Sequence, residues 1–209
     1  MKNIDLSAYN SLPESFYQRN DVLQIAEELI GKKIISIVDD RVVEVIIVET
    51  EAYNGVHDRA CHAFGGKRTP RNEVMYQQGG VAYIYLCYGI HHLFNFVTSE
   101  EGDPKAVLLR GVIPVSGYES VLERRGKNKM THRIGIGPGA AAQTLGFHTS
   151  MSGKSLLDPT WIQVQESEFH YADLSITRLP RIGVDYAGAD AQLPYRFVWE
   201  GFEKVLSGS

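Results

Sequence analysis

The sequence predicts an α+β fold, a single mixed domain of strands and helices. Its 209 residues match the length of one domain and suffice to bury a core without metal or disulfide support. Short runs rich in β-branched residues flank tight turns, as in antiparallel hairpins, and segments with helical spacing of apolar residues lie between them. No repeat or linker divides the chain, so residues 1–209 are expected to form one domain after a polar leader of about 14 residues.

The sequence predicts seven strands, of which the first four form two hairpins. They span residues 33–38, 42–48, 81–87, 92–97, 106–113, 161–164 and 196–199. The first two flank Asp39-Asp40-Arg41, which is turn-forming sequence. The next two enclose Gly89, which permits a tight reversal and puts Tyr88 at or beside a hairpin tip.

The predicted helices have recognisable start and stop residues. They span residues 22–30, 116–125 and 140–145. Asp21 caps the first helix, and Ser116 with Glu119 forms the capping box of the second. The third follows a Gly-Pro-Gly turn at 137–139, which could present backbone N–H groups to a phosphate or be a structural turn alone.

The composition is that of an ordinary globular protein, with 44% hydrophobic and 22% charged residues. No stretch approaches the roughly 20 apolar residues of a membrane helix, and the N-terminus lacks the apolar core of a signal peptide. We therefore expect a cytoplasmic protein, nucleoid-associated if bacterial, without a membrane partner. Cys61 and Cys87 form no CxxC pair and are expected to be reduced thiols.

Charge is unevenly distributed along the chain. The formal net charge is −4, yet residues 50–135 carry +3 and the remainder carries −7. The basic segment could contact phosphates or simply form a solvated loop. The candidate phosphate contacts are Arg68, Arg71, Arg124, Arg125, Lys127 and Lys129.

The stretch from Val48 to Asn95 combines carboxylates, tyrosines and histidines between two apolar runs. Period-two alternation puts Glu49, Glu51 and Tyr53 on one face at the end of a buried strand. Taken alone, such an acid is more often a salt-bridged strand-end residue, and such tyrosines are more often core or sheet-surface aromatics. The alternative interpretation is carboxylate chemistry beside an aromatic base-binding site.

Several chemistries lack their usual sequence patterns. Cys61-His62 and His91-His92 are adjacent pairs whose side chains point to different faces, and no HExxH, HxE or paired-cysteine spacing occurs. A metal site is therefore not expected. The chain also has no phosphate-loop motif, no strand-borne GxGxxG and no GxSxG elbow.

Several motifs together resemble the alkyladenine (3-methyladenine) DNA glycosylase family. They are VETEAY at 48–53, His62, TPRN at 69–72, YIYLCYG at 83–89, Asn95, VLLR at 107–110, GPG at 137–139 and RIGVDYAG at 181–188. Their order and spacing cover about residues 16–197, which makes the resemblance specific. It implies a curved antiparallel sheet with flanking helices and a projecting hairpin, no metal and no cofactor.

The resemblance also implies roles for individual residues. Glu51 matches the acid that activates the attacking water, and Arg110 matches the arginine that holds acid and water. Tyr88 matches the residue that fills the space of the flipped base. The positions of the base pocket are Tyr53, His62, Tyr85 and Asn95, the last of which crowds the exocyclic amine of guanine.

The implied activity is a monofunctional base-excision repair glycosylase, expected to be a monomer acting on double-stranded DNA with damaged purines. Ala140 stands where family members commonly have lysine, and His91 lies at a position where aromatic residues vary. A non-catalytic nucleic-acid-binding domain of the same fold is the alternative. Hydrolysis of free nucleosides is disfavoured by Tyr88 and the basic loop.

Overall fold

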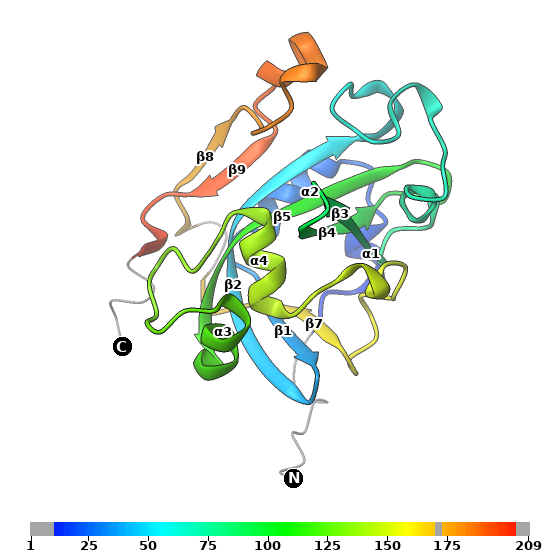
Figure 1. The fold of residues 1–209 in the computed structure, drawn as a ribbon. Coiled ribbons are helices and arrows are strands. Elements are labelled where there is room, and N and C mark those ends of the chain that lie inside the picture. Colours follow the sequence, from blue (N-terminus) through cyan, green and yellow to red (C-terminus); the bar gives the residue numbers. More distant parts are fainter. Residues whose placement is uncertain (1–10, 170–172, 204–209) are drawn as a thin grey trace.

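The computed structural model describes residues 11–169 and 173–203. A curled antiparallel sheet forms the centre, in the order β3-β4-β5-β2-β1-β7 (Figure 1). Its strands are β1 Lys33–Val38, β2 Arg41–Asn54, β3 Ala82–Cys87, β4 His91–Thr98, β5 Lys105–Ser116 and β7 Ile162–Gln165. Short strands extend it, namely β6 Gly135–Ile136 beside β5, β9 Arg196–Trp199 beside β2, and β8 Ile176–Leu179 beside β9. The predicted mixed fold with a curved antiparallel sheet is confirmed.

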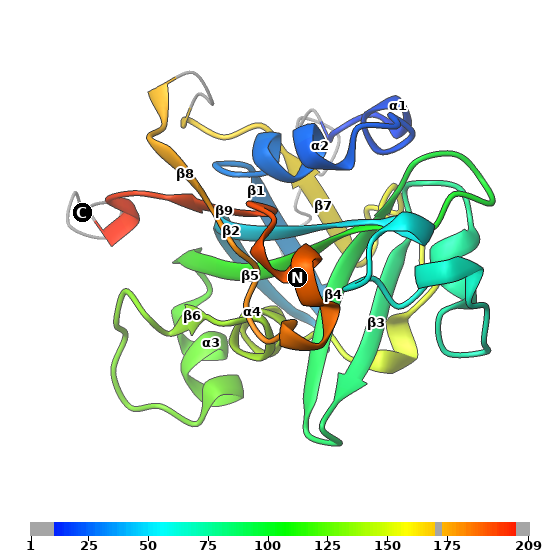
Figure 2. The same ribbon diagram turned by 90° about the horizontal axis from the view of Figure 1, so that it is seen from above.

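Helices cover both faces of this sheet. Seen from above, α1 (Glu14–Tyr17) and α2 (Val22–Glu28) lie on one side, and α3 (Tyr118–Arg125) and α4 (Pro138–Leu145) lie on the other (Figure 2). Ile25 and Ala26 of α2 and Ala141 and Ala142 of α4 are buried in the main core. No helix in residues 11–169 or 173–203 has the length and apolar character needed to cross a membrane.

One predicted helix cap agrees with the structure, and another does not. Asp21 caps α2 by accepting hydrogen bonds from the backbone N–H groups of Leu23 and Gln24, both at 3.0 Å. The predicted capping box at Ser116 is wrong, because Ser116 still pairs with Glu44 in the sheet. The N-cap of α3 is Gly117 at φ 74°, where a Cβ atom would lie 2.4 Å from the carbonyl oxygen of Val42. The chain therefore needs glycine to turn from β5 into α3.

Three register shifts interrupt the pairing of the long strands β2 and β5, and two of them lie close together on either side of Glu49. Ile47 lies opposite Val112, Glu49 opposite Gly111 and Thr50 opposite Leu109. Val48 is thus the extra residue of β2, and Arg110 is the extra residue of β5. The close approach requires Gly111, since a Cβ there would lie 2.9 Å from the Cβ of Glu49.

The hairpin of β3 and β4 projects from the body of the molecule (Figure 2). Ile90 N–H donates to the Cys87 carbonyl at 3.1 Å, and the two central residues are Tyr88 at φ 50° and Gly89 at φ 73°. Positive φ at both positions is typical of a type I′ turn, which matches the twist of the strands. The predicted tip is therefore confirmed, and Tyr88 is 91% exposed there.

Candidate active site

A cavity of about 580 Å³ lies between the sheet and the segment that follows β8. This volume is within the range of about 300–1,000 Å³ that is usual for small-molecule sites. The structure brings together in its lining the sequence-predicted residues Tyr53, His62, Arg71, Tyr85, Tyr88, Asn95 and Arg110. Glu51 lies behind this lining, in contact with Tyr53 and Arg110.

Glu51 is fully buried, and both oxygens of its carboxylate have partners. Oε1 accepts the backbone N–H of Ile182 at 2.8 Å and lies 3.2 Å from Nη1 of Arg110. Oε2 accepts the phenol hydrogen of Tyr53 at 2.8 Å. Three donors therefore compensate the cost of burying the carboxylate and fix its orientation.

The surroundings of Glu51 act on its proton in opposite directions. Burial raises the pKa of Glu51, whereas Arg110, the Ile182 N–H and the Tyr53 hydroxyl each lower it, and the pKa remains above its usual value. Burial, followed by the nearby Glu51 charge, raises the pKa of Tyr53 well above 10, so the phenol stays protonated and donates. A carboxylate with a raised pKa is suited to accept a proton near neutral pH.

Glu49 and Arg196 determine where the guanidinium of Arg110 lies. Glu49 Oε1 lies 3.1 Å from Nε of Arg110 and 3.1 Å from Nη1 of Arg196. Burial would lower the pKa of Arg110, but the carboxylates of Glu51 and Glu49 raise it, so the group remains charged. From the sequence Glu49 is only a structural strand residue, whereas here it connects Arg110 to β9.

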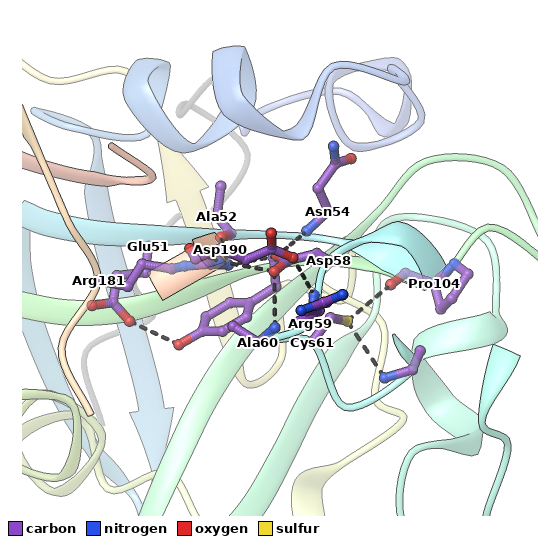
Figure 3. A network of polar contacts seen from close by, with 12 residues as sticks. Glu51, Ala52, Asn54, Asp58, Arg59, Ala60, Cys61, Pro104, Arg181 and Asp190 are labelled. Atoms are coloured by element: carbon purple, nitrogen blue, oxygen red, sulfur yellow. Dashed lines mark hydrogen bonds and ion pairs between the residues drawn. The ribbon is translucent and has the colours of Figure 1, made fainter. Parts of the chain in front are cut away.

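A second buried ion pair joins Asp58 to Arg181 near Glu51 (Figure 3). Its two hydrogen bonds join Arg181 Nη1 to Asp58 Oδ2 at 2.5 Å and Nη2 to Oδ1 at 2.8 Å. The guanidinium carbon lies 4.9 Å from the ring centroid of Tyr53 and 5.1 Å from that of Tyr195. Sequence reasoning assigned no role to either residue, and only the RIGVDYAG motif signalled Arg181.

His62 and two tyrosines form the aromatic wall of the cavity. His62 Nδ1 lies 2.9 Å from the Tyr83 hydroxyl, and its ring meets the Tyr85 ring edge-on with centroids 4.7 Å apart. Burial, with help from Arg71 and Lys67, lowers the pKa of His62 to about 4. The imidazole is therefore neutral at physiological pH.

Asn95 is buried at the base of the hairpin, and its Nδ2 donates to the carbonyl of Tyr83 at 3.0 Å. His91 at the start of β4 packs against the first turn of α4, since a Cβ on Gly139 would lie 3.0 Å from its ring. Tyr186, which sequence reasoning missed, also lines the cavity and donates its hydroxyl hydrogen to the Ala60 carbonyl at 3.0 Å. The one sequence signal for Tyr186 is its place in the RIGVDYAG motif, from which no role was assigned to it.

The candidate phosphate contacts have different surroundings. The guanidinium of Arg71 lies 5.0 Å from the Tyr85 ring centroid and donates to the Leu86 carbonyl at 3.3 Å. Arg68 pairs with Glu73 at 2.5 Å. Lys127 and Lys129 are exposed.

Arg124 and Arg125 make internal hydrogen bonds. Arg124 donates to the carbonyls of Val38 at 2.9 Å and Thr144 at 3.3 Å, and Arg125 donates to the Ile134 carbonyl at 3.0 Å. These bonds connect α3 to α4 and to β1. Contact with phosphate stays a prediction for all six basic side chains.

Comparison with known proteins places this chain among the DNA glycosylases, which act in DNA repair. The family described as "Methylpurine-DNA glycosylase (MPG)" matches residues 15–203, and the chain belongs to that family. Within the described residues, no three His, Cys, Asp or Glu side chains come together as metal ligands would.

Bacterial relatives cover nearly the whole chain. A protein of Chlamydia felis is 43% identical over 188 residues, which are 90% of this chain and 95% of the relative. A protein of Bacillus cereus is 42% identical over 196 residues, with 90% and 95% covered. One of Desulfitobacterium hafniense is 40% identical over 202 residues, with 93% and 97% covered. All three carry the name "Putative 3-methyladenine DNA glycosylase".

Proposed function

We propose that this glycosylase flips alkylated or deaminated purines out of duplex DNA and hydrolyses their N-glycosidic bond with a water molecule activated by Glu51. One observation carries the proposal. A fully buried carboxylate lies directly behind an aromatic cavity, with three donors that fix both of its oxygens.

The proposed reaction exchanges one bond for another at the sugar. The bond between C1′ and the purine nitrogen breaks, and the base leaves with the electron pair. The water oxygen forms the new bond to C1′, and Glu51 accepts its proton. The Glu51 carboxylate also stabilises the positive charge that develops on the sugar, and Arg110 positions the carboxylate. A purine alkylated at a ring nitrogen is cationic and leaves as a neutral base.

The cavity supplies the binding site for the flipped base. Tyr53, His62 and Tyr85 provide rings that can pack against a purine. Asn95 leaves little room for the exocyclic amine of guanine. Neutral His62 offers one ring nitrogen as donor or acceptor without adding charge. Shape and hydrogen bonding thus select damaged adenine-like bases.

Tyr88 is the proposed intercalating residue. Flipping a nucleotide leaves a gap in the base stack, and filling it with an aromatic ring offsets part of the cost of about a few kcal/mol. Tyr88 is exposed at the end of the two-stranded hairpin and also lines the same cavity. Exposed Lys127 and Lys129 are proposed contacts to the phosphate backbone.

Attack by water rather than by an amine leaves an intact abasic strand. No lysine lines the cavity in the described part of the chain. Borohydride should therefore trap no covalent protein–DNA adduct, and a trapped adduct would contradict a monofunctional mechanism. We further propose that the protein acts as a monomer in the cytoplasm, at the nucleoid in a bacterium.

The decisive experiment measures free base released from methylated duplex DNA by the purified protein. Release of methylated purines supports the glycosylase. A non-catalytic domain of this fold would bind the duplex and release nothing. The contact between the Glu51 carboxylate and the Arg110 guanidinium favours the enzyme, because a DNA-binding module needs no buried proton-accepting carboxylate beside its pocket.

A further inference from the structure

The guanidinium of Arg181 lies in a fully formed buried site. Its side chain is 0% exposed and that of Asp58 is 2% exposed. Besides the two bonds to Asp58, Nη1 donates to the Ala52 carbonyl at 2.9 Å and Nη2 donates to the Asp190 carbonyl at 3.2 Å. The rings of Tyr53 and Tyr195 cover it. Arg181 therefore joins β2, the loop after β2 and the segment after β8 at one point (Figure 3).

Asp58 completes this junction from the loop after β2. Its carboxylate accepts the backbone N–H of Asn54 at 2.9 Å and that of Ala60 at 3.0 Å, in addition to the guanidinium. The carboxylate oxygens thus have four donors in all from backbone and guanidinium. Both the loop conformation and the position of Arg181 depend on this one carboxylate.

Two of the three donors to Glu51 are in direct contact with Arg181. Ile182, whose N–H donates to Oε1, is the next residue in the chain. Tyr53, whose hydroxyl donates to Oε2, has its ring against the guanidinium. The third donor, Arg110, is positioned separately by Glu49. A shift of Arg181 would therefore move donors to both oxygens of Glu51.

Stability alone does not account for this arrangement. Replacing a buried ion pair by apolar residues of similar volume is often neutral or stabilising, because both charges must be taken out of water. Among the described residues, Nε of Arg181 is buried without a hydrogen-bond partner, which adds a further cost. The ion pair is instead consistent with a need to orient Ile182 and Tyr53, the residues next to Arg181.

We propose that Asp58 and Arg181 are a positioning pair, which orients the Glu51 carboxylate for activation of water by fixing the Ile182 N–H and the Tyr53 hydroxyl. This inference rests on the proposed function of Glu51. Neither residue touches the reacting atoms, since Arg181 lies behind Tyr53 and acts only through its two neighbours.

The test compares Arg181→Lys and Asp58→Asn with the wild-type protein. Both changes conserve approximate size but remove the paired hydrogen bonds. Lys32→Met is the matched control, because Lys32 is also largely buried and pairs with Glu166 at 2.8 Å, without contact to Glu51 or its donors. The first measurement is the titration of the Glu51 carboxyl by NMR, with its signal assigned from Glu51→Gln.

Loss of well-placed donors disfavours the carboxylate, so the pKa of Glu51 should rise by about one unit in both variants. It should not change in Lys32→Met. Single-turnover base release should fall about tenfold at neutral pH and recover partly at higher pH, with the affinity for abasic product duplex unchanged. An unchanged Glu51 titration in the two variants overturns the inference, whatever their rates.

The two measurements separate this inference from the proposed function. If the wild-type protein releases no base, the glycosylase mechanism fails, whereas the Glu51 titration still tests the positioning pair. Suppose that the wild type is active and that the loss of activity in Arg181→Lys is explained by its loss of thermal stability, with the same ratio of the two losses as in Lys32→Met. The pair is then structural and the inference is wrong.

Discussion

Tyr53 donates its phenol hydrogen to Oε2 of Glu51 at 2.8 Å, from a position two residues further along the same strand. Residues at this spacing point to the same side of a strand, so the contact follows from local geometry. Tyr53 also lines the cavity. One side chain therefore provides both a wall for the base and a donor to the carboxylate behind it.

Glu51→Gln should abolish base release. Glutamine retains the shape but cannot accept the proton of the attacking water, and such general-base contributions amount to about a hundredfold or more. The rate is measured by single-turnover release of methylated purine, and binding to a lesion-containing duplex should survive. Glu49→Gln is the control, since it only loosens Arg110 and should retain part of the activity. Substantial turnover by Glu51→Gln would eliminate Glu51 as the base.

As the pH is lowered, the rate of base release should begin to fall at a pH above the usual pKa of a glutamate side chain. Burial raises the pKa of Glu51 from 4.5, so the fraction of carboxylate decreases as the pH falls through that raised value. Tyr53→Phe removes a donor that lowers the pKa, so its acid limb should lie at still higher pH. A pH–rate profile of the two proteins checks the sign, and coincident acid limbs would contradict it.

Tyr88→Ala should slow excision from duplex DNA far more than from single strands. Base–aromatic stacking contributes about 1–3 kcal/mol, and only a duplex leaves a gap to be filled. Single-turnover rates on both substrates measure the difference. Ile90→Ala at the same tip is the control, because Ile90 is also exposed but has no ring. Equal losses on the two substrates would instead identify Tyr88 as a wall of the base pocket.

Arg71→Gln should increase the excision of cationic lesions relative to neutral ones. The guanidinium of Arg71 lies over the Tyr85 ring, where it repels a cationic base and occupies part of the electron-rich surface. The experiment compares release of cationic 3-methyladenine with release of neutral hypoxanthine, because both lack the exocyclic amine of guanine. Arg68→Gln is the control, because Arg68 is paired with Glu73. A uniform loss for both lesions would indicate a phosphate contact.

His62 should make the fold less stable in mild acid. Its pKa is lowered from 6.5 to about 4, mainly by burial, so below pH 6.5 the unfolded chain binds a proton that the folded chain does not. The free energy of unfolding has its full value above pH 6.5 and decreases as the pH falls toward 4. Between pH 7 and pH 5 it should decrease by about 1–2 kcal/mol. Urea unfolding measures this loss, which should be smaller in His62→Gln. An equal loss would contradict the assignment.

Local sequence patterns predicted most of the sheet. The bounds Lys33–Val38 and Arg196–Trp199 agree with the predicted strands to the residue. Strand β2 runs six residues beyond its predicted end at Val48, because its polar end pairs with β5 and β9. Strand β8 was not predicted, since its residues are mostly half-exposed and are extended only through pairing with β9.

The candidate site was predicted only in part. Family motifs identified the residues that line the cavity, but not the partners that orient them. Asp58 and Arg181 are 123 residues apart in the chain, and no local pattern indicates that they meet. Glu49 and Arg196 are 147 residues apart. Such long-range ion pairs depend on how the sheet curls, which propensity and periodicity do not specify.

The bulges at Val48 and Arg110 compensate each other, so the strands are in the same alignment on both sides of the site. A deletion of either residue alone would turn every later side chain of that strand to the opposite face. Deleting both would restore the alignment but would remove the Arg110 guanidinium that contacts Glu51. In evolution, a change of length in one of these strands is therefore tolerated only with a compensating change in the other, although the two segments are distant in the sequence.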